Sequence, residues 1–509
     1  MNKISNIPWD INQISEAKIY CAKIYNNIFP ELNHSLNKYH KISWDRQQYE
    51  KLLGNWVFNF IEILYDRWFY PGKYLANSDE LITYLSSDII DFGNNCISDG
   101  FNSTINNHLM YIKDNSQLKH VFFPEKIGCL QNFEISQFND SLIQIHNQYH
   151  LNQRRGISGW FDYNYKSWML RGLAQDLNIL LNKPVSVNVD KIWRLSLLKN
   201  KITSFSEVCK ILLRIYMPIV FLEGFKALKK CADKYCFRIT YTANSTHFDI
   251  PFKFMIANWD NKTKLLCHQH GGGYGIDLSC QGEKYDRSIS DIFYTWGWIE
   301  DRKTHPLPSP PRIRKYNRKK SKKLLLTCVN YPKYLYKLNY YHIGQNTLTL
   351  INNTINFVKI TKHLNLEISY YHSDYNWDVR SRFEKEDAII PEKSLNYGDY
   401  SLYICNYLGT SWLETLAANL PTICFYDQDI IAFRKAVKPH IDLLKNMGVL
   451  HTSPESAAEK VLETYRNPSL WWANSEIQEA RKEFVKKYAL FDDKWLVHWR
   501  DEFSKVLND

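Results

Sequence analysis

Apolar positions follow two different patterns along the chain, and the change between them divides the sequence into regions. In residues 46–68 the apolar side chains recur every three or four positions, which predicts an amphipathic helix. They are Tyr49, Leu52, Leu53, Trp56, Phe60 and Ile63. Residues 80–113 and 138–150 show a similar but less regular pattern. The first third of the chain is therefore expected to be helical.

From about residue 215 the apolar positions form short uninterrupted runs, which are typical of buried strands. The runs are 219–225 (IVFLEGF), Lys264–Cys267, Ile292–Trp298, Leu324–Val329, Leu366–Tyr371, Leu402–Cys405 and Thr422–Phe425. Strands that alternate with helices predict parallel sheets covered by helices on both faces. The tail, roughly 455–509, has a helical pattern and is rich in tryptophan.

A proline-rich and basic stretch separates the two groups of predicted strands. His305–Arg312 holds four prolines, and Arg312–Lys323 is almost entirely basic. Proline removes backbone donors and restricts the backbone, so this stretch predicts a linker. The basic run is either a solvated connector or a contact with anionic lipid.

These boundaries predict an α/β fold with two facing Rossmann-like domains, a helical N-terminal region and a helical C-terminal tail. The predicted parts are an N-terminal acceptor-side domain (1–310), a basic linker (311–323), a nucleotide-binding domain (324–470) and a tail (471–509) that packs back on the N-terminal domain. Ligands of open α/β sheets bind at the carboxyl ends of strands, so the cleft between the domains is the expected site.

Composition narrows the class of protein. Hydrophobic residues make up 45% and charged residues 23% of the 509 residues, which is typical of a folded globular protein. The net charge of +11 is not gathered in tails, which disfavours a nucleic-acid partner and suits anionic substrates or a membrane surface. The 11 cysteines form no CxxC pair, so neither a zinc site nor a disulfide framework is indicated.

Location can also be predicted from composition. The N-terminus lacks the apolar core of a secretory signal, and no run approaches the roughly 20 apolar residues of a membrane span. We therefore expect a cytoplasmic protein whose contact with the inner membrane, if it has one, is peripheral. Aromatic residues, 15% of the chain, suit either a sugar-binding cleft or simple core packing.

The segment Tyr403–Asn419 (YICNYLGTSWLETLAAN) predicts a strand, a short glycine-containing loop and a helix. The N–H groups at a helix start bind phosphate, and Thr410 and Ser411 would add hydroxyl donors. Glu414, one turn later, is placed to accept hydrogen bonds from a ribose. The alternative is a plain capping box, because Ser411 and Glu414 match the S-x-x-E pattern.

The segment His268–Gly275 (HQHGGGYG) is the second candidate. His268 and His270 are two positions apart on a predicted strand, so we expect them to face the same side. The glycines would let a sugar or another chain approach the backbone closely. The pattern is not GxGxxG, and two histidines alone do not predict a metal site. The alternative is a structural glycine turn with a buried histidine.

Carboxylates that could act in glycosyl transfer follow this segment. A retaining transfer needs a nucleophile or ion-pair stabiliser, and an inverting one needs a base. The candidates are Asp277, Glu283, Asp286, Asp291 and, further upstream, Glu223. Each alone could be a surface charge; Glu283, together with His270, is favoured for the chemistry. Asp374, after another predicted strand, is expected at the cleft edge.

Several segments, in order along nearly the whole chain, resemble bacterial surface-carbohydrate transferases associated with nonulosonic acids. They include LNKYH and LLGNWVFNFIEILYDR, HQHGGGYG with DIFYTWGW, NYPKYLY, DYNW, YLGTSWLETLAANLPTICF and SPESAAEKV. That family includes pseudaminic acid transferases and is similar in fold logic to capsule Kdo transferases. The resemblance implies a GT-B fold, a CMP-activated nonulosonate donor, a glycan acceptor of the capsule or O-antigen, no metal or other cofactor, and retention of configuration.

Carried over by motif, the resemblance also implies site residues. On the N-terminal side the cleft would be lined by His268, Gln269, His270, Gly272, Gly273 and Tyr274. On the C-terminal side CMP would contact Thr410, Ser411, Glu414, Asn406, Gly409 and Asp374. Gly409 departs from the expected pattern, because a polar residue is expected there.

Two further classes of function remain open from the residues. A CDP-polyol phosphotransferase of the teichoic-acid kind also uses two Rossmann-like domains, but it would favour a histidine base for in-line transfer. A non-enzymatic scaffold of a polysaccharide-assembly complex would be expected to have lost its cleft residues, whereas the cluster here is intact.

Overall fold

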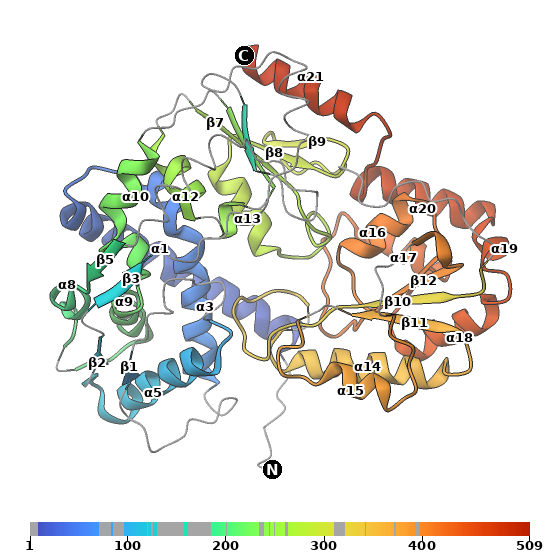
Figure 1. The fold of residues 1–509 in the computed structure, drawn as a ribbon, viewed down its shortest axis with the longest axis horizontal. Coiled ribbons are helices and arrows are strands. Elements are labelled where there is room, and N and C mark those ends of the chain that lie inside the picture. The colour runs from blue at the N-terminus through green and yellow to red at the C-terminus, as the bar shows by residue number, and fades with distance from the viewer. Residues whose placement is uncertain are drawn as a thin grey trace. The chain divides into compact units, whose positions relative to one another are not determined.

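The structure is a computed structural model of the 509-residue chain, and it describes most of the sequence. The described residues are 9–70, 83–84, 96–119, 121–123, 126–129, 157–160, 185–199, 201–233, 239–243, 245–248, 250–259, 263–309, 321–341, 343–370, 373–391 and 397–508. Two units make up the fold, and Figure 1 labels their elements. Among these residues, the first unit contains Asn12–Leu265 and Tyr334–Leu338, and the second contains the rest.

Helices form most of the first unit. The predicted helix over 46–68 is confirmed as a continuous run of α2 (Arg46–Tyr49), a π-helical turn η1 (Glu50–Gly54) and α3 (Asn55–Phe69). Asp45 starts this run with a reciprocal capping box to Gln48. The other described helices of the unit are α1 (Ile11–His40), α5 (Asp99–Asn115), α8 (Lys191–Leu195), α9 (Phe205–Ile215), α10 (Phe225–Ala232), α11 (Ser245–Phe248) and α12 (Ile250–Asn258).

Short strands accompany these helices, and two predictions for this region need correction. Within 80–113, α5 confirms a helix, but Thr83–Tyr84 is a strand, β1. The run at 219–225 is a 3-10 turn, η5 (Ile219–Phe221), because Pro218 precedes it and full burial between helices leaves no periodicity to distinguish a turn from a strand. Residues 138–150 lie outside the described residues. The remaining strands are β2 (Val121–Phe122), β3 (Lys126–Cys129), β4 (Ile157–Trp160), β5 (Val185–Asn188) and β6 (Ile239–Thr242).

A segment distant in sequence joins the first unit through buried polar groups. The carboxylate of Glu62 on α3 accepts a hydrogen bond from the backbone N–H of Leu338 at 2.8 Å. The ammonium of Lys18 on α1 donates to the Leu338 carbonyl at 2.6 Å and lies 3.7 Å from Glu62. Burying two charges requires such partners, so Tyr334–Leu338 is fixed to α1 and α3.

Three parallel strands follow along the chain, and within the first of them the chain passes from the first unit to the second. They are β7 (Lys264–His268), β8 (Ile292–Thr295) and β9 (Thr304–Pro306), with α13 (Gln281–Ile289) between the first two. Strand β9 corrects the expected linker at its start, because Thr304–Pro306 pairs with β8. Proline is tolerated there because β9 pairs on one side only, with β8. Most of the basic run 311–323 lies outside the described residues.

A five-stranded parallel sheet follows in the order β11-β10-β12-β13-β14. Its strands are β10 (Leu324–Cys328), β11 (Leu366–Tyr370), β12 (Leu402–Cys405), β13 (Thr422–Phe425) and β14 (Leu450–His451). The first four confirm the predicted strands, whereas β14 was not predicted. The helices after β10 are α14 (Asn346–Ile360), α15 (Val379–Glu384), η6 (Tyr397–Asp399), α16 (Thr410–Ala417), α17 (Lys438–Asn446), α18 (Pro454–Thr464), α19 (Pro468–Trp472), α20 (Ser475–Tyr488) and α21 (Trp495–Asn508).

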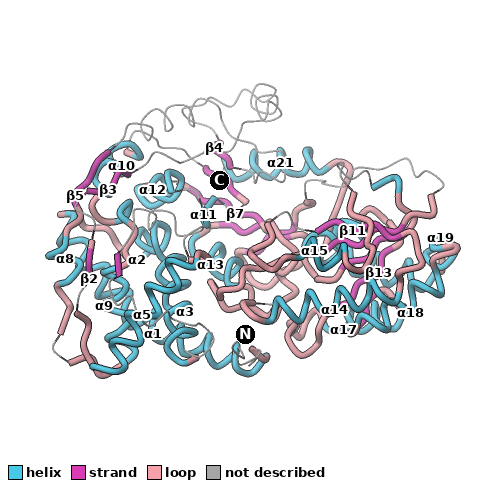
Figure 2. The backbone as a smooth tube through the Cα atoms, turned by 60° about the horizontal axis from the view of Figure 1, so that its bottom comes forward, coloured by secondary structure: helices cyan, strands magenta, loops and turns pink. Residues whose placement is uncertain are grey.

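Helices cover both faces of this sheet, as Figures 1 and 2 show. On one face, Leu326, Ile404 and Ile423 of the strands pack with Phe357 of α14 and Val461 of α18. On the other face, α16 and α20 pack together, and the rings of Trp412 and Phe484 lie 4.9 Å apart. These two layers confirm the α/β fold class and its parallel sheets. The predicted domain limits stay a prediction.

The helical tail, 455–509, is confirmed as α18 to α21. Helix α21 packs on β7 and β8, because the Trp499 ring lies 4.7 Å from His268 and 5.0 Å from Tyr294. The Trp499 indole N–H also donates to the carbonyl of Pro308 at 2.9 Å. Within the described part of the chain, no helix is both long enough and apolar enough to span a bilayer.

Candidate functional site

The candidate site is built where β7 ends in the glycine turn. Strand β7 stops at His268, so His270 lies beyond the strand, and the expectation that both histidines face one side of it is wrong. The turn closes when the backbone N–H of Asp277 donates to the Gly273 carbonyl at 2.9 Å. Gly275 has a φ of +72°, a conformation that favours glycine.

His268 is a core residue. Its side chain is completely buried, and its Nε2 accepts a hydrogen bond from the indole N–H of Trp296 at 2.9 Å. Burial, reinforced by the neighbouring His270, lowers the pKa of His268 to about 3. The imidazole is therefore neutral and engaged, which makes a part in proton transfer unfavourable.

Gln269 holds the turn against the strands. Its side-chain oxygen accepts hydrogen bonds from the backbone N–H of Trp296 at 3.0 Å and from the indole N–H of Trp298 at 2.8 Å. Its amide group donates to the carbonyl of Gly271 at 2.9 Å. Two of these bonds join the turn to the segment that begins after β8, so Gln269 positions the turn.

The glycines of the turn touch the other candidate segment. A Cβ added to Gly272 would lie 2.0 Å from the carbonyl oxygen of Gly409, and one added to Gly271 would lie 3.8 Å from the hydroxyl of Thr410. The glycines were expected to let a sugar or another chain approach the backbone closely, and the segment that does so is the backbone of Gly409. The two predicted motifs are therefore in contact.

Gly409 is enclosed on two sides. Besides Gly272, the ring of Tyr407 covers it, because a Cβ at position 409 would lie 2.1 Å from that ring. Glycine here, where a polar residue was expected, is therefore required by packing. The Tyr407 hydroxyl in turn bonds the hydroxyl of Ser411 at 3.0 Å.

Helix α16 starts as predicted, after β12 and a short loop, but it has no capping box. Its N-cap is Gly409, which has no side chain to accept a hydrogen bond from the first N–H groups. The capping interpretation of Ser411 and Glu414 is therefore wrong, because the helix begins two residues earlier than that pattern needs. Thr410, Ser411 and Glu414 are half-buried. The uncapped helix start carries donors and a positive dipole end.

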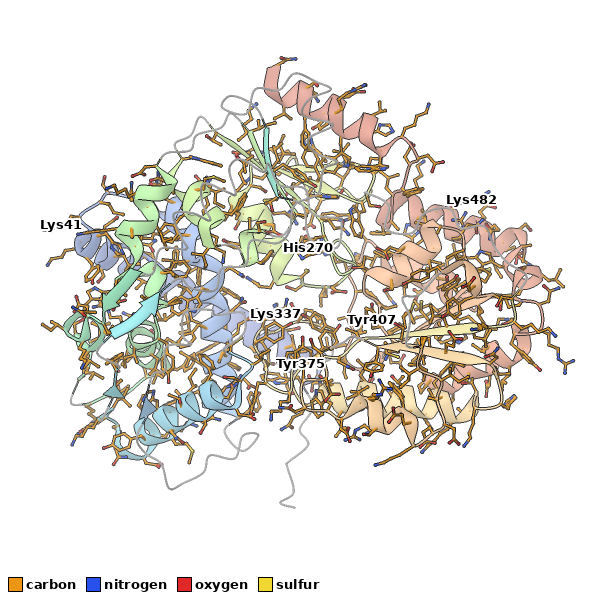
Figure 3. All side chains as sticks on the ribbon, viewed as in Figure 1. Lys41, His270, Lys337, Tyr375, Tyr407 and Lys482 are labelled. Atoms are coloured by element: carbon orange, nitrogen blue, oxygen red, sulfur yellow. The ribbon has the colours of Figure 1, made fainter. Side chains whose placement is uncertain are left out.

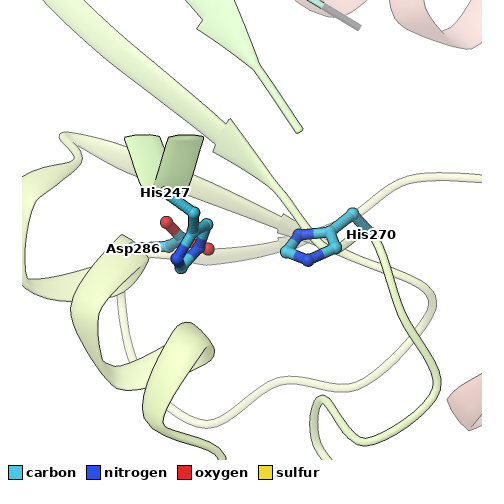
Figure 4. Close-up of side chains that lie close together, drawn as sticks. All are labelled: His247, His270 and Asp286. Carbon is cyan, nitrogen blue, oxygen red and sulfur yellow. The ribbon is translucent and has the colours of Figure 1, made fainter. Parts of the chain in front are cut away.

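His270, Tyr274 and Asp286 form a hydrogen-bonded chain. The Tyr274 hydroxyl lies 3.1 Å from Nδ1 of His270 and donates to the carboxylate of Asp286 at 3.2 Å. Asp286, on α13, is fully buried, and His270 is half-buried. Figure 4 shows the His270 ring turned with one edge toward Asp286. His247, also drawn there, belongs to α11 of the first unit.

Glu283, the favoured carboxylate, is fully occupied by structural partners. It is completely buried, and both of its oxygens lie within 2.8 Å of the guanidinium of Arg434. Arg287 donates to it at 2.9 Å and the backbone N–H of Gly275 at 2.8 Å. A carboxylate with this many donors has little capacity left for a substrate.

Asp277 has a different environment. It is 8% exposed, and its carboxylate covers Gly273, because a Cβ there would lie 2.3 Å from one oxygen. Burial raises the pKa of Asp277 well above its ordinary value, although Arg434 opposes the shift. Among the described residues no group donates a hydrogen bond to this carboxylate. Buried carboxylates normally have such donors, so Asp277 is the carboxylate best placed to meet a ligand.

The remaining predicted site residues lie apart from this centre or serve the fold. Glu223 forms a bidentate ion pair with Arg194 at 2.8 Å in the first unit. Asp291 is exposed on the surface before β8. Asp374 accepts from the backbone N–H groups of Asp378 and Val379 at 2.8 and 2.7 Å and so shapes its own loop. Asn406 is buried after β12 and donates to Thr354 at 2.7 Å.

Loops at the carboxyl ends of other strands carry further polar groups. Figure 3 labels His270, Tyr375 and Tyr407, which follow β7, β11 and β12. Tyr375, Asn376 and Asp378 all have positive φ angles, of 53°, 64° and 52°. Non-glycine residues held in this region cost about 1 kcal/mol or more each and cluster at functional sites.

Arg434 is the residue that sequence reasoning missed. Its guanidinium binds Glu283, donates to the Asp277 carbonyl at 3.0 Å and lies over the Trp298 ring at 5.6 Å. It follows β13 by nine positions, inside an irregular loop with no periodic pattern. The only sequence signal was a basic residue beyond a predicted strand end.

Comparisons with known proteins place the chain in a family. The model of the LIC12162 family transferases matches residues 2–503, nearly the whole chain. No curated protein matches.

Solved structures give weak similarities. TarM shares 12% identity over 53% of this chain and 55% of its own, with a TM-score of 0.34. S. aureus MnaA with UDP shares 10% over 56% of this chain and 79% of its own, with a TM-score of 0.36. The spinosyn rhamnosyltransferase SpnG shares 8% over 56% and 77%, with a TM-score of 0.31. The match spans little more than half of TarM, and scores of this size carry no argument about the chain. The family match alone decides the assignment: the chain belongs to the LIC12162 family of transferases.

Proposed function

We propose that this transferase moves a nonulosonic acid of the pseudaminic acid kind from a CMP-activated donor to a surface polysaccharide. The transfer would occur between two Rossmann-like halves of a GT-B enzyme, without a metal ion and with retention of configuration. The observation that carries the proposal is the uncapped start of α16, which follows a parallel strand and touches the glycine turn. Uncapped helix starts at this position of an α/β sheet suit a phosphate.

The residues around α16 suit the parts of such a donor. The N–H groups of the helix start and the hydroxyls of Thr410 and Ser411 would hold the phosphate, and Glu414 would accept from the ribose. A nonulosonate reacts through an oxocarbenium-like transition state, which a nearby carboxylate stabilises. Asp277 supports this role because its buried carboxylate has no hydrogen-bond donor among the described residues.

A thermal-shift panel of CMP, CDP, UDP and GDP tests the proposal. A ligand that binds only the folded state at 100 times its Kd adds about 2.7 kcal/mol of stability, so CMP should raise the melting temperature most. Glu414→Ala should lose most of this increase. Glu476→Ala, an exposed change in the first turn of α20, is the matched control and should keep it.

The outcomes separate the alternatives. Equal protection of Glu414→Ala and the unchanged protein by CMP would show that the ribose role is wrong. Stabilisation by UDP or GDP but not by CMP would refute the donor class. Incubation with CMP-pseudaminic acid and a glycan acceptor should release CMP and extend the glycan. Transfer of a phosphoryl-polyol from a CDP-polyol instead would identify a phosphotransferase.

A further inference from the structure

A short ribbon of two antiparallel segments holds the backbone around Asp277. On one side of it, the backbone N–H of Leu278 donates to the Ala432 carbonyl at 2.8 Å. On the other side, the backbone N–H of Arg434 donates to the Ile276 carbonyl at 3.0 Å. Asp277 lies between these two bonds in an antiparallel bridge. A segment 157 positions away from Asp277 therefore fixes the backbone on both sides of it.

The side chain of Arg434 adds a third attachment. Its Nε–H donates to the carbonyl of Asp277 itself at 3.0 Å. Its other two nitrogens bind carboxylates, that of Glu283 on α13 at 2.8 and 2.7 Å and that of Glu300 after β8. The guanidinium is planar, so partners on three of its edges fix its orientation. One side chain therefore ties Asp277 to α13 and to the segment after β8.

The carboxylate of Asp277 depends on this backbone for its position. Among the described residues no group donates a hydrogen bond to it, and one of its oxygens lies against Gly273. The backbone of Asp277 is held from both ends, because its N–H donates to the Gly273 carbonyl at 2.9 Å and its carbonyl accepts from Arg434. A shift of about 1 Å at a reacting group can cost about 100-fold in rate, so this support matters for a carboxylate that acts on a substrate.

We propose that Arg434 is a positioning residue that holds the Asp277 carboxylate over the glycine turn, where it faces the anomeric carbon of the donor. This inference rests on the proposed glycosyl transfer, in which Asp277 stabilises positive charge at that carbon. The hydrogen bonds of Arg434 fix the backbone from which the carboxylate projects. Its charge acts as well: burial raises the pKa of Asp277 most, Arg434 opposes this shift, and Glu283 adds to it.

Arg287 provides a matched control within the same cluster. It donates to Glu283 at 2.9 Å and lies 3.0 Å from Glu300, so it shares both acidic partners with Arg434. Each of the two arginine side chains is 16% exposed. In the described part of the chain, however, Arg287 has no hydrogen bond to Asp277. The two arginines therefore differ in the one contact that the proposal concerns.

Kinetics separate the effect of position from that of charge. Lysine keeps the charge but cannot hold three partners in one plane, so Arg434→Lys should lower kcat by about 100-fold with a smaller change in KM. The acid limb of its pH profile should stay close to that of the unchanged protein. Arg434→Gln also removes the charge, so its acid limb should move to higher pH, because Asp277 then stays protonated to higher pH. Arg287→Lys should keep kcat close to that of the unchanged protein, and CMP should stabilise all three variants.

The effect of charge can also be measured without any transfer. In protein labelled with ¹³C-aspartate, the carboxyl signal of Asp277 is assigned by its loss in Asp277→Asn. Its titration midpoint should lie at higher pH in Arg434→Gln than in the unchanged protein. Arg287→Gln should leave the midpoint nearly unchanged, because Arg434 is the cation that lowers the pKa of Asp277. The same midpoint in all three proteins would overturn the proposal.

The failures are distinguishable. If transfer is observed and Arg434→Lys and Arg287→Lys lower kcat equally, the positioning role is refuted, since the loss is then general to the cluster. A kcat unchanged by Arg434→Lys would refute it too. If the midpoint of Asp277 moves as expected but no protein, the unchanged one included, transfers a sugar, the proposed function has failed and the coupling of Arg434 to Asp277 stands.

Discussion

At the scale of single residues, Gly272 joins the two halves of the candidate site. The missing side chain lets the backbone of Gly409 approach, and Gly409 is the residue from which α16 starts. A methyl group there would meet a carbonyl oxygen at 2.0 Å, which cannot rotate away as a side chain can. The position of the start of α16 therefore depends on the absence of a side chain at Gly272.

Gly272→Ala is expected to destabilise the protein by about 1–3 kcal/mol, because overpacking forces the backbone to shift. It should also weaken CMP-induced stabilisation, since the shift moves the N-cap of α16. Gly100→Ala is the control, because nothing lies within 4 Å of its added Cβ, and it should be neutral or slightly stabilising. Thermal melts with and without CMP provide both values, and unchanged CMP protection in Gly272→Ala would contradict the packing argument.

At the scale of elements, α21 packs directly on strands β7 and β8. Trp499 supplies a ring against His268 and Tyr294 and a hydrogen bond to Pro308. Trp499→Ala should therefore cost about 3–5 kcal/mol, the usual range for removing a buried large aromatic side chain. Val497→Ala on the same helix, where the valine is 42% exposed, should change stability by less than about 0.5 kcal/mol.

Hydrogen exchange measures this prediction locally. Amides of β7 and β8 should exchange faster in Trp499→Ala than in Val497→Ala, while those of β10 and β12 should be little changed. Equal exchange across all four strands in the two variants would show that α21 does not support this layer.

The elements that sequence could predict are those with a strong local pattern. Leu324–Cys328 and Leu402–Cys405 are fully buried parallel strands, and continuous apolar runs indicate such strands well. The run at 219–221 is equally apolar and equally buried, yet it is a 3-10 turn, because burial alone does not distinguish the two. Leu450–His451 is too short for any periodicity, and Thr304–Pro306 contains a proline that argues against a strand.

The candidate site was predictable in its segments but not in its contacts. The histidine–glycine turn and the start of α16 were both recognised by residue type and position after strands. That Gly272 meets Gly409 depends on tertiary packing, which no local pattern encodes. Likewise Glu283 could not be distinguished from Asp277 by sequence, because its structural role depends on Arg434, 151 positions away.

At the scale of the whole molecule, buried histidines make the free energy of unfolding depend on pH. Burial lowers the pKa of His40 and His108 to about 4 and, with the neighbouring His270 adding to it, lowers the pKa of His268 to about 3. In the unfolded chain each of these histidines takes up a proton near pH 6.5, whereas in the folded protein it stays neutral at that pH. The unfolded state then binds more protons, so these groups lower the free energy of unfolding as the pH falls below about 6.5. Buried carboxyls such as Glu62, whose pKa burial raises, act in the opposite direction.

Comparing variants isolates one histidine from these opposing groups. His268→Gln keeps an acceptor for the Trp296 indole but has no titrating ring, so its free energy of unfolding should fall less steeply with acid than that of the unchanged protein. The difference in slope should reach at most about 1.4 kcal/mol per pH unit, the value for one proton, between pH 6 and pH 4. His363→Gln, an exposed position, is the control and should keep the original slope. Denaturant unfolding at a series of pH values measures the slopes, and parallel curves for His268→Gln and the unchanged protein would mean that His268 takes up its proton in the folded state.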